Sequence, residues 1–266
     1  MVPPALGMGS WTGAALNPLR QVKHRFRREF ALRLRSIGMS RVRHVAGGRI
    51  LSGPFRGAAY DNALAEGTPG PKLLGTYELE LRPALEPCLA QGVETLVNVG
   101  GGGGYYAVGV ALRMPAARIL VFESQALGRA AIADNARRNQ VSSRVEILGE
   151  CRPAELASVL SPDRHDLMVM DVEGAESELL TPTVLARLKL SRVVVEAHEF
   201  IVPGVTWWLQ GQLAPTHAVS VITSRLRRAE DWPVPLWLPL SVKLALMDEE
   251  RPCPMEWVIG IPREAS

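Results

Sequence analysis

Five short apolar runs in the middle of the chain each end in polar or acidic residues. They cover residues 96–99, 119–122, 145–151, 166–171 and 192–199. Segments of helical length separate them, and strands that alternate with helices are typical of a parallel sheet. Two later runs, residues 218–222 and 257–261, are further strand candidates. The pattern predicts an α/β fold with a doubly wound, mostly parallel sheet.

The first apolar run opens into five consecutive glycines, Gly100 to Gly104. A glycine-rich turn lets the main chain approach a ligand closely, and the N–H groups that open the next helix face anionic groups such as carboxylate or phosphate. The second run ends in Glu123, about 20 residues later, where a carboxylate can accept hydrogen bonds from both ribose hydroxyls. We therefore expect a nucleoside ligand with a charged tail.

Two cofactor classes fit the glycine run. Gly102, Gly104 and Ala107 match the G-x-G-x-x-A pattern of dinucleotide-binding proteins, although five glycines satisfy many patterns by chance. The looser G-x-G-x-G pattern of enzymes that use S-adenosyl-L-methionine (SAM) follows a polar residue at the strand end, here Asn98. Its glycines are Gly100, Gly102 and Gly104. The second pattern places its polar residue better, and we expect these residues to contact the cofactor.

The ends of the later runs supply further candidate contacts. Glu150 and Cys151 end the third run, where the carboxylate can accept a hydrogen bond from an adenine amino group. The fourth run ends in Asp171, and the fifth includes Glu196 and His198. Because ligands of open parallel sheets bind at the carboxyl ends of the strands, we expect these side chains to border one crevice with the glycine turn and the residues ending the first two runs.

Three motifs in this order resemble the class I SAM-dependent methyltransferases, and within them the FkbM-type family. In that family the glycine loop reads like D-V-G-A-N-x-G-Y-Y, the fourth strand ends in D-x-E-G-x-E, and the fifth ends in E-x-H. This chain offers N-V-G-G-G-G-G-Y-Y, D-V-E-G-A-E and E-A-H, within roughly residues 70–260. Asn98 stands where the family usually has aspartate. Asn135 and Asn139 lie on an intervening helix, as such asparagines often do in the family.

The resemblance implies a Rossmann-like methyltransferase fold with a seven-stranded sheet, whose last strand is inserted antiparallel. It also implies SAM as cofactor and O-methylation of a small-molecule or glycan-like acceptor. His198 is the first candidate for the base that takes the hydroxyl proton, because the ordinary pKa of histidine is near neutral. Asp171 would orient the acceptor or polarise His198, whereas Glu173 and Glu176 are interpreted as helix-capping carboxylates.

Other interpretations remain open. Asp171, Glu173, Glu196 and His198 offer oxygen and imidazole ligands for a divalent metal, but spacing does not establish a site, so we predict none. Asn98 and the bare glycine loop also suit a SAM- or nucleoside-binding module that lacks catalysis. An NAD-dependent oxidoreductase would rest on the dinucleotide pattern alone.

Charge divides the chain unevenly. Residues 1–50 carry ten Lys and Arg against one acid, whereas the remainder carries 20 against 26. An apolar stripe at helical spacing predicts a basic amphipathic helix there, formed by Leu19, Val22, Phe26, Phe30, Leu34 and Ile37. Such a helix can lie on anionic lipid, although packing on the domain is the preferred interpretation, and nucleic acid is not an expected partner. We expect a basic N-terminal extension, residues 1–70, and a SAM-binding domain, residues 71–266.

Composition limits the remaining possibilities. With 266 residues and 47% hydrophobic content, the chain can bury a full core. No apolar run approaches the roughly 20 residues that span a bilayer, and the first residues lack the order of a signal peptide, so we expect a cytoplasmic protein. Cys88, Cys151 and Cys253 lack the C-x-x-C spacing of zinc or redox sites.

Two segments outside the motifs carry weaker expectations. Residues 72–81 are predicted to begin a helix that leads to the first strand, with Tyr77 and Glu78 as candidate cofactor contacts by resemblance. Four tryptophans gather late in the chain and either wall an acceptor pocket or anchor irregular loops: Trp207, Trp208, Trp232 and Trp237.

Overall fold

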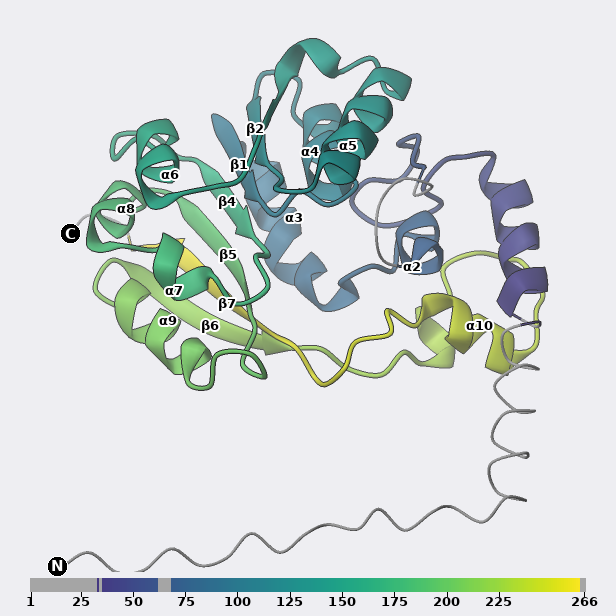
Figure 1. Cartoon of the computed structure of the whole chain (residues 1–266). Coiled ribbons are helices and arrows are strands. Elements are labelled where there is room, and N and C mark those ends of the chain that lie inside the picture. Colours follow the sequence, from purple (N-terminus) through teal and green to yellow (C-terminus); the bar gives the residue numbers. More distant parts are fainter. Residues whose placement is uncertain (1–32, 34, 62–67, 264–266) are drawn as a thin grey trace, which may run out of the picture.

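The computed structural model of the protein describes residues 33, 35–61 and 68–263. A seven-stranded sheet forms its centre, in the order β3-β2-β1-β4-β5-β7-β6 (Figure 1). The strands are β1 (Thr95–Val99), β2 (Arg118–Phe122), β3 (Val145–Leu148), β4 (Leu167–Met170), β5 (Arg192–Ala197), β6 (His217–Thr223) and β7 (Glu256–Pro262). Strand β7 runs antiparallel to both neighbours, and the pairs from β3 to β5 are parallel. The predicted Rossmann-like methyltransferase fold is confirmed.

Helices cover both faces of the sheet, and others lie beyond its strand ends. From residue 69 onward, the helices are α2 (Pro69–Leu74), α3 (Arg82–Gln91), α4 (Tyr105–Arg113), α5 (Ala126–Arg138), α6 (Pro153–Val159), α7 (Glu176–Leu179), α8 (Pro182–Arg187), α9 (Val205–Leu213) and α10 (Leu240–Met247). Short 3-10 turns are η1 (Leu79–Leu81), η2 (Ser142–Arg144) and η3 (Ala229–Asp231).

The two faces of the sheet build two separate hydrophobic clusters. Neighbouring strand residues point to opposite faces, so Leu96 packs with α3, α4 and α5, whereas Val97 packs with α6, α7, α8 and α9. Because both faces are buried, the strands appear in the sequence as continuous apolar runs rather than alternating ones.

A group of helices lies beyond the carboxyl ends of the strands, on the right of Figure 1. Helix α2 packs on α10, and residues 35–46 are also helical. A Cβ added to Gly38 would lie 2.6 Å from Val242 Cγ1 of α10, so the two helices pack closely. This group forms the side of the molecule that faces the strand ends.

Two asparagines tie the segment before residue 62 to the sheet domain. Asn139 accepts from the N–H of Ala59 at 2.8 Å and donates to its carbonyl at 2.7 Å. Asn135 pairs with the N–H and carbonyl of Asp61 in the same way, at 2.8 and 2.9 Å. Each asparagine amide thus bonds both the N–H and the carbonyl of one residue, as a neighbouring strand would. Between these two residues, Tyr60 is buried in the hydrophobic core.

The helix expected over residues 72–81 is wrong in extent. Helix α2 ends at Leu74, because Gly75 adopts a left-handed conformation with φ of 76° and its N–H bonds back to the carbonyl of Lys72. Tyr77 and Glu78 therefore lie in a turn, and the chain becomes helical again only in η1 and α3.

The predicted basic amphipathic stripe falls almost entirely outside the described residues, which include only Ile37 of its six apolar positions. Ile37 is 59% exposed. Across residues 33, 35–61 and 68–263, no helix combines the length and the apolar character that crossing a membrane requires.

Candidate functional site

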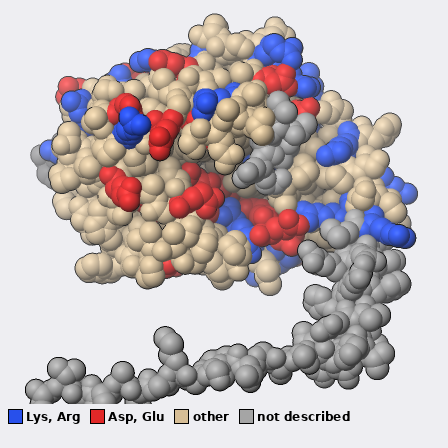
Figure 2. Space-filling model, viewed as in Figure 1, with Lys and Arg blue, Asp and Glu red and all other residues tan. Residues whose placement is uncertain are grey.

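A crevice of about 790 Å³ opens at the carboxyl ends of the parallel strands. Its walls also include Lys72 of α2 and the segment 249–252 that follows α10. The six strand-end residues expected to share a crevice all line it: Asn98, Glu123, Glu150, Asp171, Glu196 and His198. Acidic side chains border the hollow near the centre of Figure 2.

The glycines of the turn differ in how much space surrounds them. Gly100 has φ of 81°, and a Cβ added there would overlap the backbone oxygen of Asp171. Gly102 has φ of 50°, but an added Cβ would meet nothing within 4 Å. Gly104, with φ of 80°, caps the start of α4. Gly100 is therefore required by close packing with β4, whereas Gly102 leaves free space in the crevice wall.

Glu123 is anchored beside that free space. Its Oε2 accepts from the N–H of Gly102 at 2.7 Å, and its Oε1 accepts from the N–H of Gln125 at 2.8 Å. Gly128 makes room, since a Cβ there would lie 2.8 Å from Glu123 Cδ. A carboxylate has about four lone-pair sites, so two remain for donors from a ligand.

Asn98 has one unused acceptor. Its side chain is 2% exposed, and its amide nitrogen donates to the carbonyl of Val169 at 3.3 Å. Its Oδ1 has no hydrogen-bond partner among the described residues. An orphaned buried acceptor costs about 1–3 kcal/mol, and a ligand that donates to it removes that cost. The ammonium group of SAM is such a donor, so this residue fits the cofactor in spite of its missing charge.

The two residues after β3 lie nearer the rim of the crevice. The Glu150 side chain is 71% exposed, and its nearest cation, Arg152, is 3.9 Å away. Burial raises the pKa of the half-buried Cys151 thiol to about 12, which keeps it protonated and unreactive. Both line the crevice, and their contacts with an adenine ring stay a prediction.

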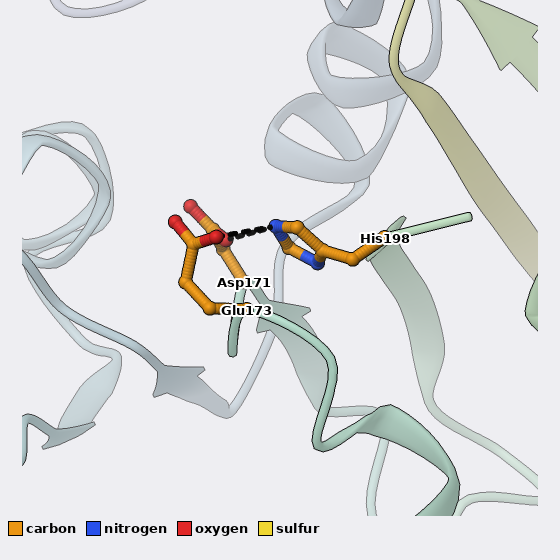
Figure 3. A group of neighbouring side chains, drawn as sticks. All are labelled: Asp171, Glu173 and His198. Carbon is orange, nitrogen blue, oxygen red and sulfur yellow. Dashed lines mark ion pairs between the residues drawn. The ribbon is translucent and has the colours of Figure 1, made fainter. Parts of the chain in front are cut away.

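His198, after β5, meets two carboxylates that follow β4, as Figure 3 shows. Its Nε2 lies 3.2 Å from Glu173 Oε2 and 3.5 Å from Asp171 Oδ1. The imidazole is 3% exposed, whereas the side chains of Asp171 and Glu173 are 37% and 76% exposed. The structure therefore brings together the two predicted catalytic residues and adds Glu173.

Glu176 holds the other side of the same ring. It is fully buried at the start of α7, and its Oε1 lies 2.5 Å from His198 Nδ1. The same oxygen accepts from the N–H of Gly174 at 3.1 Å, so the helix-capping interpretation is incomplete. Its order in the D-V-E-G-A-E motif is the only sequence signal, because nothing in the spacing shows that its side chain turns towards β5.

Three nearby carboxylates raise the pKa of the His198 imidazole: Glu176, Asp171 and Glu196. Burial by itself lowers the pKa of His198, but the hydrogen bond to Glu176 and the charges of Asp171 and Glu196 outweigh it, and the pKa is raised above its usual value. The pKa of Asp171 is also raised, mainly by burial. At neutral pH the imidazole of His198 therefore carries a positive charge more readily than a free histidine does, and Asp171 holds a proton more readily than a free aspartate does.

Backbone strain gathers around the crevice. Among the described residues, the non-glycine residues with positive φ are Glu78, Gln140, Glu173 and Glu250. All except Gln140 line the crevice. Left-handed backbone is costly for residues other than glycine and persists where the surroundings impose it, often at functional sites. The value of 51° at Glu173 belongs to the turn that carries its carboxylate to His198.

A buried ion cluster, which the sequence does not predict, forms another part of the crevice wall. Arg251 donates to Glu196, to Glu78 Oε1 at 3.2 Å and to Glu249 Oε2 at 2.8 Å, and its guanidinium lies 4.8 Å from the Trp257 ring centre. Burial raises the pKa of Glu196 to about 8. Its carboxylate pairs with Arg251, and Glu196 is not in the group formed by Asp171, Glu173 and His198.

The turn between α2 and η1 closes the same side of the crevice. Lys72 is 8% exposed and its Nζ lies 4.8 Å from the centre of the Tyr77 ring, while burial lowers its pKa. The Tyr106 hydroxyl donates to Glu78. Tyr77 and Glu78 line the crevice, as their candidate role requires. Trp257 also lines it, whereas none of Trp207, Trp208, Trp232 and Trp237 does.

No protein-family model matches this chain, and no curated protein matches it. Solved structures with a similar fold include a precorrin 8w decarboxylase from Methanobacterium thermoautotrophicum, at 17% identity over 66% of this chain and 87% of that chain, with a TM-score of 0.45. An O-methyltransferase from Bacillus cereus in complex with SAH (S-adenosylhomocysteine) is 14% identical over 66% and 77% of the two chains, with a TM-score of 0.44. The C-terminal domain of a precorrin-6Y C5,15-methyltransferase from Rhodobacter capsulatus is 19% identical over 71% and 89%, with a TM-score of 0.47. The fold assignment rests on the strand order of this chain itself.

Proposed function

We propose that the protein is a SAM-dependent O-methyltransferase of the FkbM type, acting on a hydroxyl of a small-molecule or glycan-like acceptor. One observation carries this proposal. A single crevice at the strand ends is lined both by the open glycine turn with Glu123 and by the group around His198. A nucleoside bound by the first set of residues and an acceptor bound by the second would meet within it.

The residues around the glycine turn would each bind a different part of SAM. Glu123 accepts from the ribose hydroxyls with the lone pairs that Gly102 and Gln125 leave free. Asn98 accepts from the ammonium group through its unpaired Oδ1. Glu150 and Cys151 border the adenine. The glycine turn lets the main chain approach the charged tail.

The residues around His198 would bind and activate the acceptor. When bound, SAM supplies a methyl group on a positively charged sulfur that keeps the carbon–sulfur electron pair. Because such a transfer is an in-line displacement, aligning the acceptor oxygen provides much of the acceleration. Glu176 accepts a hydrogen bond from the Nδ1–H of His198, which leaves the Nε2 lone pair on the side of Asp171 and Glu173. His198 then receives the hydroxyl proton, and Asp171 orients the acceptor.

The sheet topology favours SAM over NAD. In the dinucleotide-binding fold the strand order is 3-2-1-4-5-6. Here the antiparallel β7 separates β5 from β6. The G-x-G-x-x-A match at Gly102, Gly104 and Ala107 lacks the sheet in which it usually occurs, so the oxidoreductase alternative loses its support.

Location and membrane contact belong to the same proposal. A cytoplasmic protein agrees with the composition of the chain, and a basic N-terminal helix would bring the crevice to an acceptor at a lipid surface. The stripe of that helix lies outside the described residues, so its contact with lipid rests on sequence alone. The division of the chain at residue 70 is likewise a prediction.

Calorimetric titration of the full-length protein with SAM, S-adenosylhomocysteine and NADH tests the cofactor class. Saturable binding of the first two and none of NADH is expected. Binding of NADH, or of none of the three, would remove the proposal. Binding of SAM without methyl transfer over a broad acceptor panel would favour the module without catalysis.

A further inference from the structure

The donor atoms of Asp171, Glu173 and His198 are spaced as ligands of one divalent cation. One donor atom of each residue lies within 4.8 Å of the others. The two distances to His198 Nε2 are 3.2 Å and 3.5 Å. Neighbouring ligands of an octahedral ion with bonds of about 2.1 Å lie about 3 Å apart. Small movements of the exposed Glu173 side chain would complete the geometry.

The imidazole is held in the form that a metal needs. Glu176 accepts at Nδ1 from within the protein, at 2.5 Å, and therefore leaves the Nε2 lone pair on the side of Asp171 and Glu173. Metal-binding histidines usually donate their second nitrogen to such a carboxylate, which sets the tautomer and the direction of the ring. With His198 3% exposed, the ring cannot reach another partner without moving β5.

Charge at the group is only partly compensated. Asp171 Oδ1 and Glu176 Oε2 are buried, and neither has a hydrogen-bond partner among the described residues. The charges of Lys72 and Arg251 act on Asp171, but Arg251 is also engaged by Glu78, Glu196 and Glu249. Because three carboxylates surround one imidazole, a divalent cation would neutralise the negative charge that remains.

We propose that Asp171, Glu173 and His198 bind one divalent cation of the Mn²⁺ or Mg²⁺ class, with Glu176 as the positioning residue behind His198. Carboxylates suit these ions, and one imidazole favours Mn²⁺ of the two. The remaining positions are open to the crevice. Resting on the proposed function, the inference adds that the acceptor is an oxygen compound whose hydroxyl binds the cation and gives its proton to solvent water in the open crevice. The cation then replaces His198 as the group that activates the hydroxyl.

Titration of the metal-stripped full-length protein with Mn²⁺, followed by electron paramagnetic resonance, tests the site in the absence of SAM. One Mn²⁺ per chain is expected. Glu173→Gln should weaken binding by at least about tenfold, as losses of metal-site residues typically do. Because the Glu173 side chain is 76% exposed, this variant should fold normally. Glu178→Gln, an exposed position on α7 that does not line the crevice, is the matched control and should bind as the wild type does.

No saturable Mn²⁺ binding, or equal affinity in the wild type and Glu173→Gln, would overturn the inference. SAM titration of the same preparation in EDTA keeps the two proposals apart. SAM binding without a Mn²⁺ site would leave the methyltransferase proposal standing with His198 as the base. A Mn²⁺ site that Glu173→Gln removes, in a protein that does not bind SAM, would support the metal site and remove the proposed function.

Discussion

Replacing Glu123 by alanine is the most direct test of how the crevice would hold a nucleoside. The carboxylate is 8% exposed and accepts from the backbone at Gly102 and Gln125, with two lone-pair sites left for ribose hydroxyls. Hydrogen bonds to a charged group contribute about 1.5–3 kcal/mol each, so losing two of them costs about 3 kcal/mol or more. Since about 1.4 kcal/mol corresponds to a factor of ten, SAM affinity should fall by about 100-fold.

Calorimetric titration measures this change, and two further variants separate its causes. Glu123→Gln keeps an oxygen that can accept from Gly102 but loses the charge, so its affinity for SAM should lie between those of the wild type and Glu123→Ala. Glu146→Ala removes an exposed carboxylate of β3 that pairs with Arg118 outside the crevice, and it should bind SAM as the wild type does. Thermal unfolding establishes that each variant is folded.

The reasoning would be refuted if the wild type bound SAM and folded Glu123→Ala bound it within about threefold, since that difference is under 1 kcal/mol. The ribose would then lie elsewhere in the crevice. Weaker binding by Glu146→Ala to the same extent would also refute it, because the effect would not come from the crevice.

The other predictions concern packing and charge. Gly100→Ala should lower the unfolding free energy by about 3 kcal/mol or more, because the added Cβ overlaps the backbone of Asp171. Gly102→Ala should lower it by only about 1 kcal/mol, since the added Cβ meets nothing. Equal melting temperatures of the two variants would contradict this reasoning. Glu176→Gln should lower the pKa of His198 measured by NMR, since burial would then be opposed less; an unchanged pKa would exclude the contact as its cause. Burial raises the pKa of Glu196 to about 8, so its contribution to stability, full below its unfolded pKa of about 4.5, is lost as pH rises through about 8. The melting temperature of Glu196→Gln should therefore change less between pH 6 and pH 9 than that of the wild type. An equal change in both proteins would contradict the assignment of this pH dependence to Glu196.

Much of the fold could be predicted because its strands are buried on both faces. The runs at residues 96–99 and 119–122 fall within β1 and β2, since a strand covered by helices on both sides must be apolar at nearly every position. The helix expected over residues 72–81 failed for a local reason. Apolar spacing continues past Gly75, but the left-handed backbone at that glycine ends α2 after Leu74.

In the candidate site, too, some features could be predicted from the sequence and others could not. Asn98, Glu123 and Asp171 could be placed in one crevice because they lie at the carboxyl ends of parallel strands, which meet at one edge of the sheet. The partners of Asn135 and Asn139 could not be predicted, because a helical asparagine carries no sign of which backbone it will bind. Their contacts fasten residues 59–61 to the domain across more than 70 positions of sequence.

The sequence by itself determined the elements, their order and the line of polar residues at the strand ends, because these depend on local spacing and on the rule that parallel strands end together. Only the tertiary structure decided which of those residues touch. It joined Glu176 to one nitrogen of His198, turned Asp171 and Glu173 towards the other, and withdrew Glu196 to Arg251. Those choices depend on side-chain directions and on the balance of buried charge, which exist only once distant segments have packed together.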